Sequence, residues 1–305
     1  MTQKELREQL KEEAAHVEAY LSNCLALLPE LPAGLRAAME YSLLAGGKRL
    51  RPALCLSGSA LFGLTDTAVL PFAAALECIH SYSLIHDDLP AMDDDDLRRG
   101  KPSNHKQFGE ATAILAGDGL LTDAFFFMAS VGLPSGVRPE LPAERTLRAI
   151  QAVALAAGSP GMVGGQYLDM LYTATPQMTL EQLRKMQAAK TGALIAVSLL
   201  SGAILAGADA EDLTRVENYG RCLGMAFQIV DDILDETGDE AALGKPVGSD
   251  ASRGKITYPS LLGLEQSRLL AEEAGARALE HIRDFSGEEA LFLRDLVEYV
   301  LQRSS

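Results

Sequence analysis

Apolar residues recur at helical spacing along almost the whole chain, whereas alternating runs of β-branched residues are nearly absent. This periodicity predicts an all-α fold with no convincing strand. Segments rich in glycine and proline, for example 31–34, 132–142 and 238–254, divide the chain into roughly ten helices. None of these breaks is long or polar enough to be a linker, so we expect residues 1–305 to form a single domain. Segment 238–254 is typical of a functional loop.

The charge balance limits the possible partners. The chain has 27 Lys and Arg against 42 Asp and Glu, a net charge of -15. A nucleic-acid partner is not expected, because binding to a phosphate backbone needs a clustered basic surface. The four cysteines are scattered, which is typical of buried thiols in a reducing compartment. Segment 1–13 is densely charged and lacks the apolar core of a secretory signal, so a cytoplasmic location is expected.

One uncharged stretch, from Thr191 to Ala208, reaches the lower length for a membrane span. It is diluted by glycine and serine and has no flanking aromatic residues. A helix that is apolar all round is typically buried in a protein core. We therefore expect a buried central helix here and no stable membrane insertion.

A dense acidic group follows an apolar helical segment: six aspartates lie within ten residues, at Asp87, Asp88 and 93–96. Adjacent carboxylates repel one another, so a partly buried group of them needs cations, and Mg²⁺ is usually held by one or two carboxylates together with substrate phosphates. The alternative is a solvated acidic turn, the usual role of a charge run. Pro90 argues against it, because a helix interrupted there can bend back and place Asp87 and Asp93 on one side.

A second acidic group, Asp231, Asp232 and Asp235, lies about 140 residues later. Asp231 and Asp235 are four residues apart and therefore share one face of a helix. They could merely decorate a helix end, but carboxylates are unfavourable near the negative end of the helix dipole, and a bound cation explains their position better. Because both acidic groups end apolar helices, we expect those helices to face each other across a deep central cavity.

Basic residues accompany both acidic groups. Segment 46–52 reads Gly-Gly-Lys-Arg-Leu-Arg-Pro, and its three cations after a glycine pair suit a diphosphate, although such a segment is as often an ordinary loop. Arg98 and Arg99 follow the first acidic group directly, and their guanidinium groups match phosphate oxygens. In a protein of net charge -15 these placements indicate an assembly of metal ions and an anion.

Together these residues resemble the trans-type prenyl diphosphate synthases, over about residues 46–266. The segment from Asp87 to Asp93 resembles the family's first aspartate-rich motif in its bacterial form, and 231–235 resembles the second. The resemblance implies the isoprenoid synthase fold, a homodimer, and three Mg²⁺ ions that bind an allylic diphosphate. The metal ions would be held directly, or through waters and hydrogen bonds, by Asp87, Asp88, Asp93, Asp231, Asp232 and Asp235.

The same resemblance implies roles for the other polar residues. Isopentenyl diphosphate would be bound by Lys48, Arg51, His80 and Arg99. The allylic diphosphate would be surrounded by Arg98, Lys190, Thr191, Gln228, Lys245 and Lys255, with Gln166 and Asp169 on the opposite wall. Catalysis would depend on Asp87, Asp93, Lys190 and Asp231, because fixed cations stabilise the pyrophosphate that leaves the allylic substrate. The double bond of isopentenyl diphosphate then attacks the allylic cation, which an apolar cavity protects from water.

Product length is expected to depend on Tyr82 and Ser83. Tyr82 precedes Asp87 by five residues and would lie about 7.5 Å deeper along the helix axis. An aromatic residue there would close the cavity and is typical of relatives that make the fifteen-carbon farnesyl diphosphate, which we favour over the twenty-carbon geranylgeranyl product. The alternative is an ordinary core tyrosine. A terpene cyclase would not need a second diphosphate site, and a non-catalytic synthase subunit commonly lacks one of the two aspartate motifs.

Overall fold

The computed structural model describes residues 3–64, 66–133, 140–173, 177–238 and 254–303. The chain is 78% helical with almost no strand, which confirms the predicted all-α fold. Within the described ranges there are twelve α-helices of eight residues or more, where the sequence predicted roughly ten.

The first half of the chain contains the helices that precede and follow the first acidic group. They are α1 (Gln3–Cys24), the 3-10 turn η1 (Leu25–Leu27), α2 (Ala33–Leu43), α3 (Leu50–Ala60), α4 (Asp66–Asp87), α5 (Asn104–Phe108) and α6 (Glu110–Ser130). The second half contains α7 (Ala143–Ala157), α8 (Met162–Thr173), α9 (Leu180–Gln187), the π-helical turn η2 (Ala188–Gly192), α10 (Ala193–Ala206), α11 (Ala210–Thr237), α14 (Tyr258–Leu262), α15 (Leu264–His281) and α16 (Glu288–Gln302).

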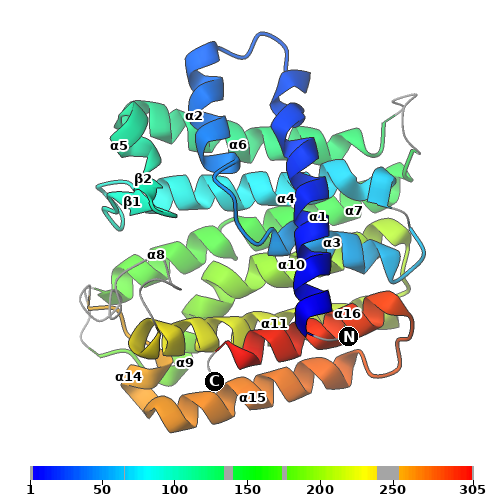
Figure 1. Cartoon of the computed structure of the whole chain (residues 1–305), viewed down its shortest axis with the longest axis vertical. Helices are drawn as coiled ribbons and strands as arrows, with labels where there is room; N and C mark the ends of the chain where they lie inside the picture. The colour runs from blue at the N-terminus through cyan, green and yellow to red at the C-terminus, as the bar shows by residue number, and fades with distance from the viewer. Residues whose placement is uncertain (1–2, 65, 134–139, 174–176, 239–253, 304–305) are drawn as a thin grey trace.

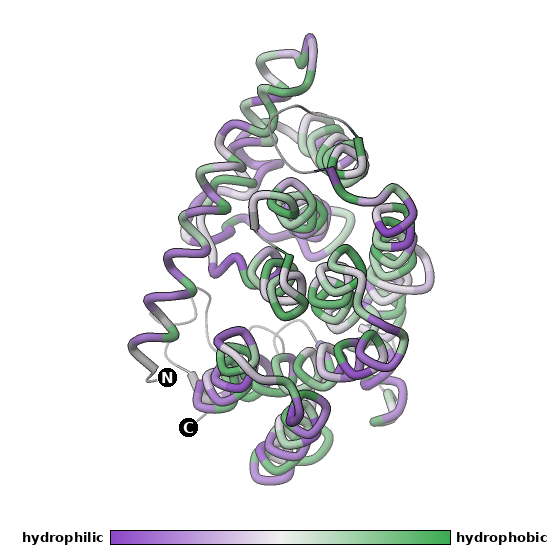
Figure 2. Tube along the Cα trace, turned by 90° about the vertical axis from the view of Figure 1, so that its right-hand side faces the viewer, coloured by the Kyte–Doolittle hydropathy of each residue, from purple (hydrophilic) through white to green (hydrophobic). Residues whose placement is uncertain are grey.

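The long helices lie in tiers, as Figure 1 shows. Helices α4 and α6 form the upper tier, α3, α8 and α10 lie below them, and α11, α15 and α16 form the lowest tier, with α1 and the upright α2 crossing the front. The tiers are joined because α4 packs on α6 and α3, and α10 packs on α3, α7 and α11. Figure 2 looks along several of these helices, which appear as rings. The last turn of α4 therefore reaches the end of the bundle where α8, α9 and α14 also lie (Figure 1).

Helix α10 is the buried central helix that the uncharged stretch predicted. Its residues enter two separate apolar clusters, with Leu194 and Val197 in one and Ile195 and Leu199 in the other. It approaches α3 very closely, because a Cβ atom added to Gly202 would lie 2.0 Å from a backbone oxygen of that helix. Apolar burial on both faces is the main stabilising contribution for such a helix.

Three described segments are long and apolar enough to cross a membrane by length and composition alone: Thr67–Asp87, Glu110–Ser130 and Leu180–Ala206. Their most apolar windows are 78%, 39% and 67% buried inside the fold, respectively. The middle segment, α6, therefore has the smallest buried share of the three and leaves large apolar side chains exposed, among them Leu115 and Phe126.

One small β-hairpin corrects the expectation that the chain has no strand. Leu97–Arg98 (β1) pairs antiparallel with Lys101–Pro102 (β2). The two residues between them, Arg99 and Gly100, have φ angles of 53° and 75°. Positive φ at both central positions is characteristic of the type I′ turn that joins tight hairpins, so the glycine was the local signal for it. Two-residue strands are too short to produce an alternating pattern.

Candidate active site

The first acidic group folds back on itself at Pro90, as the sequence predicted. Helix α4 ends at Asp87, and the backbone N–H of Asp93 donates to the Asp87 carbonyl at 2.9 Å. The N–H of Asp95 likewise donates to the Asp88 carbonyl at 3.2 Å. The loop after α4 thus returns to the end of the helix and brings Asp93 next to Asp87.

The Asp87 carboxylate lies where negative charge is unfavourable. Burial raises its pKa to about 6, and the neighbouring Asp93 adds to the rise, while Lys190 is the strongest of the cations that oppose it. The opposing cations do not outweigh burial, so a further cation bound at the end of α4 would favour the charged form of Asp87.

Asp88 is held differently from its neighbour. It is only 2% exposed, and Arg98 Nε donates to its Oδ1 at 3.0 Å, with a second bond from Arg98 Nη2. Burial raises the pKa of Asp88, whereas the hydrogen bond from Arg98 lowers it. Because successive helical residues point about 100° apart, Asp88 faces the hairpin while Asp87 faces the interior of the site. The predicted supporting role of Asp88 in metal binding stays a prediction.

Two lysines from distant segments meet the acidic residues. Lys190 Nζ donates to Asp169 Oδ2 at 2.6 Å, and Lys255 Nζ lies 3.7 Å from the same oxygen and 3.2 Å from Asp93 Oδ2. Lys190 stands in the π-helical turn η2, a kind of turn that is frequent at functional sites. Helix α8 passes so close to this turn that a Cβ on Gly165 would lie 2.2 Å from the backbone nitrogen of Lys190.

In the second acidic group, Asp232 and Asp231 differ in their exposure and in their hydrogen-bond partners. Asp232 is 3% exposed and accepts hydrogen bonds from Gln187 Nε2, Gln228 Nε2 and the Tyr258 N–H, at 2.9 to 3.0 Å. It therefore joins α9, α11 and α14. The Asp231 side chain is 44% exposed, and Arg303 Nη2 lies 3.2 Å from its Oδ1. Asp235 is buried.

The residues predicted to bind the second diphosphate form a basic region around the end of α3 that carries Arg51. Burial lowers the pKa of Arg51 to about 10, and its Nε is buried without a hydrogen-bond partner. Burial, together with the charges of Arg51 and Arg99, lowers the pKa of His80 well below its ordinary value, so this imidazole is neutral. Lys48 Nζ lies 5.9 Å from the centre of the Tyr299 ring.

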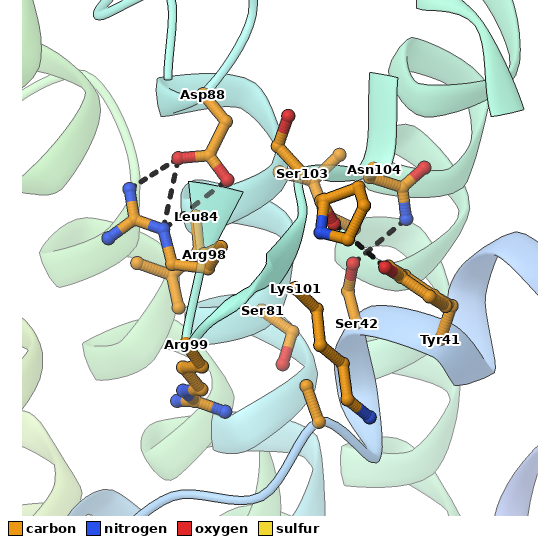
Figure 3. A pocket seen from close by; sticks show the side chains of 13 residues that line it. Tyr41, Ser42, Ser81, Leu84, Asp88, Arg98, Arg99, Lys101, Ser103 and Asn104 are labelled. Carbon is orange, nitrogen blue, oxygen red and sulfur yellow. Dashed lines mark hydrogen bonds and ion pairs between the residues drawn. The ribbon is translucent and has the colours of Figure 1, made fainter. Parts of the chain in front are cut away.

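The two acidic groups, with the side chains that bond them, are called the acidic region below. The β-hairpin connects this acidic region with the basic region. In Figure 3 the adjacent side chains of Arg98 and Arg99 point away from each other, Arg98 toward Asp88. Arg99 Nη1 donates to the Gly46 carbonyl in the basic segment. A small cavity of about 20 Å³ lies beside the hairpin and is lined by both arginines, Ser81 and Asn104 (Figure 3).

Other predicted residues stand as follows. Gln166 has both side-chain amide atoms buried without a partner, so its hydrogen-bonding capacity is open to a ligand. Ser83 Oγ donates to the His80 carbonyl at 2.8 Å, and Tyr82 is 6% exposed. Thr191 lies in the π-helical turn beside Lys190. Lys245 lies outside the described residues, as does most of the predicted loop 238–254.

Sequence reasoning missed several partners in this region. Glu77 is buried in α4 and contacts Arg49, and Gln187 and Arg303 hold residues of the second acidic group. The only signal for Glu77 was a lone acidic residue inside an otherwise apolar segment, because a charge in such a place is rarely buried without a partner.

The described residues contain no group of three or more His, Cys, Asp or Glu side chains placed to hold a metal ion. The acidic side chains are instead joined by lysines, so the expected Mg²⁺ sites and the deep cavity between the two acidic groups stay predictions.

Comparison with known proteins gives consistent matches. Residues 32–291 match the model of the family described as polyprenyl synthetase. The chain is 46% identical to farnesyl diphosphate synthase of Geobacillus stearothermophilus, covering 97% of this chain and 98% of that protein. It is 44% identical to a chloroplastic geranylgeranyl pyrophosphate synthase of Catharanthus roseus, covering 92% and 77%. The crystal structure of an FPP/GFPP synthase from Zymomonas mobilis has a TM-score of 0.84 at 37% identity, covering 97% and 99%.

Proposed function

The chain belongs to the polyprenyl synthetase family, whose members elongate isoprenyl diphosphates, and we propose that it makes (2E,6E)-farnesyl diphosphate. In this reaction it condenses isopentenyl diphosphate with dimethylallyl diphosphate and then with geranyl diphosphate. The observation that carries the proposal is the pairing of two unlike regions at one end of the bundle. One holds the buried Asp87 carboxylate close to Asp93, and the other holds Arg51, whose Nε is buried without a hydrogen-bond partner.

The acidic region fits divalent cations, which this family uses. The raised pKa of Asp87 and its proximity to Asp93 mark a pair of hard oxygen donors that a cation would stabilise. We propose Mg²⁺, three ions in all, with Asp87 and Asp93 on one side and Asp231 and Asp235 on the other. When bound, such ions neutralise the charge that develops on the departing pyrophosphate.

The protein's own groups provide the rest of the chemistry. The carbon–oxygen bond of the allylic substrate breaks and its electron pair leaves with pyrophosphate, toward which Lys190 and Lys255 can turn from their partner Asp169. The double bond of isopentenyl diphosphate then forms the new carbon–carbon bond. The proton lost afterwards goes to the pyrophosphate, because the nearby His80 is surrounded by positive charge and is a poor base.

The first experiment is product chromatography after incubation with Mg²⁺, isopentenyl diphosphate and dimethylallyl diphosphate. Farnesyl diphosphate as the main product supports the proposal, and a twenty-carbon main product would favour the geranylgeranyl alternative, which the Catharanthus roseus relative represents. Hydrocarbon formed from farnesyl diphosphate alone, without condensation, would contradict both.

The farnesyl product rests on Tyr82 closing the cavity below Asp87. Its ring stands edge-on to His86, 5.6 Å between centroids, and burial raises its pKa to about 12. Tyr82→Ala should shift the products toward longer chains because the large side chain is removed. Tyr167→Ala, at a 65% exposed position on α8, is the matched control. An unchanged product profile for Tyr82→Ala would contradict the role of Tyr82.

We also propose that the active form is a homodimer. Support comes from large apolar side chains that stay exposed on α6 and α7, among them Leu115, Phe126, Leu147 and Leu155. Sedimentation equilibrium at micromolar concentration should give twice the chain mass of 32.6 kDa, and a single-chain mass would contradict the proposal. The cytoplasmic location stays a prediction.

A further inference from the structure

Arg49 stands in the basic segment between two predicted ligands, Lys48 and Arg51, yet its own side chain points away from solvent. It is 2% exposed and all three of its guanidinium nitrogens are used. Nη1 donates to Glu77 Oε1 at 2.7 Å, Nη2 to the Leu43 carbonyl at 2.9 Å, and Nε to Glu18 Oε1 at 3.2 Å. One side chain therefore connects the start of α3 with α1, α2 and α4.

The backbone of Arg49 shows that this contact sets the path of the chain. Its φ and ψ are 49° and 35°, a left-handed conformation at the N-terminal end of α3. This conformation is unfavourable for a residue with a Cβ, and it persists where surrounding contacts impose it. The Ala53 N–H donates to the Arg49 carbonyl at 3.1 Å, so the same residue begins the helix that carries Arg51. The orientation of Arg51 thus depends on the anchoring of Arg49.

Glu77 is the other half of the contact and is itself only 2% exposed. It lies three residues before His80, about one helical turn, on the helix that ends in Asp87. Its charge also acts beyond Arg49, because it raises the pKa of both Arg51 and Arg99 against the effect of burial. Glu77 is therefore the fixed counter-charge within the basic region.

We propose that Arg49 and Glu77 are positioning residues for the binding site of isopentenyl diphosphate, a role that rests on the proposed function. The pair fixes the segment bearing Lys48 and Arg51 to the helix bearing His80. Within the described residues the pair does not contact the carboxylates of the acidic region. Its loss should therefore weaken the binding of isopentenyl diphosphate and leave the binding of the allylic diphosphate unaffected.

The decisive variant is Arg49→Lys, which keeps the charge beside Glu77 and loses the three-way fork. We expect the KM for isopentenyl diphosphate to rise about tenfold, and the KM for geranyl diphosphate and kcat at saturation to stay within about twofold, as for loss of an interaction that acts on binding alone. Isothermal titration of isopentenyl diphosphate without an allylic substrate gives the same affinity change independently of turnover. Arg215→Lys is the control. Arg215 Nη2 donates to Asp284 Oδ2 at 2.6 Å, and this pair lies outside the basic region.

A second variant separates positioning from folding. Arg49→Met alone leaves Glu77 buried without its partner, whereas Arg49→Met with Glu77→Met replaces both charges by apolar groups, an exchange that commonly restores stability. The double variant should fold and still bind isopentenyl diphosphate about tenfold more weakly, because the fork is absent.

The outcomes separate this inference from the proposed function. Wild-type protein that neither binds nor consumes isopentenyl diphosphate would overturn the proposed function. If the wild-type protein is active, two results would overturn the positioning role alone. One is an unchanged affinity for isopentenyl diphosphate in Arg49→Lys and in the double variant. The other is an equal rise in the KM values for isopentenyl diphosphate and geranyl diphosphate.

Discussion

The acidic and basic regions of the site balance their charges in opposite ways. In the basic region the counter-charge is Glu77, a buried carboxylate fixed in the middle of a long helix. In the acidic region the counter-charges are partly exposed and come from the hairpin, a π-helical turn, a segment between helices and the end of α16: Arg98, Lys190, Lys255 and Arg303.

This difference indicates which kind of ion each region can take up. A fixed internal carboxylate cannot leave, so the basic region keeps its net positive charge and its open donors for an incoming anion. Partly exposed cations on long, flexible side chains can move aside, so the acidic region can replace them with metal ions. The following predictions test the contrast, from the largest effect to the smallest.

The largest effect is expected for Asp87→Asn, which removes one charge from the acidic region without changing its shape. Loss of a metal ligand at the reacting phosphate should lower kcat by about 1000-fold. The measurement is steady-state turnover at saturating substrates and Mg²⁺. Asp94→Asn, at an exposed neighbouring position, should retain activity, and equal losses in the two variants would remove the distinction between these aspartates.

Arg98→Met should cost stability because it leaves the buried Asp88 carboxylate without its main partner. Since Arg98 is itself partly exposed, we expect a decrease of about 2 kcal/mol in the free energy of unfolding, measured by urea titration. Lys106→Met breaks the exposed ion pair between Lys106 on α5 and Asp96 before the hairpin. It should cause no resolvable change in the free energy of unfolding. If the two variants behaved alike, Asp88 would not differ from a surface carboxylate.

His80 predicts a pH dependence of stability that arises in the basic region. Its pKa is lowered in the folded protein by burial and nearby arginines, whereas the unfolded chain takes up a proton near pH 6.5. The stability contributed by neutral His80 is therefore present above pH 6.5 and lost as the pH falls below it, at up to about 1.4 kcal/mol per pH unit. Relative to wild type, His80→Gln should have a shallower loss between pH 6.5 and 5, and parallel curves would contradict this.

The smallest effect is expected at Arg303, whose guanidinium lies 3.2 Å from Asp231 in competition with any metal ion there. A partly exposed ion pair of this kind contributes about 1 kcal/mol, so Arg303→Met should strengthen divalent binding by roughly threefold. Titration with Mn²⁺, followed by electron paramagnetic resonance, measures this without turnover. Weaker binding in the variant would mean that Arg303 supports the metal site.

The parts of the site that the sequence predicts are those written in local patterns. The helical period predicts the fold, and Pro90 after the aspartate pair predicts the turn that brings Asp93 back to Asp87. Two features could not be found in this way. The π-helical turn at Lys190 needs only one extra residue per turn and leaves no compositional mark, and the contact of Arg49 with Glu77 joins residues 28 positions apart. Both arise from packing between helices, as the close approach at Gly165 illustrates.

The short hairpin has a consequence for how the two substrates are kept apart. Arg98 ends β1 and Arg99 begins the turn, and their side chains leave the hairpin in different directions, Arg98 to Asp88 and Arg99 to the Gly46 carbonyl, so this one hairpin divides its two arginines between the diphosphate regions. Deleting Leu97 would remove half of β1 and shift both arginines relative to their partners, while leaving the composition of the segment almost unchanged. In this chain a change in the length of the segment next to β1 should therefore disturb both diphosphate regions at once, whereas a substitution of Arg98 or Arg99 should disturb one of them.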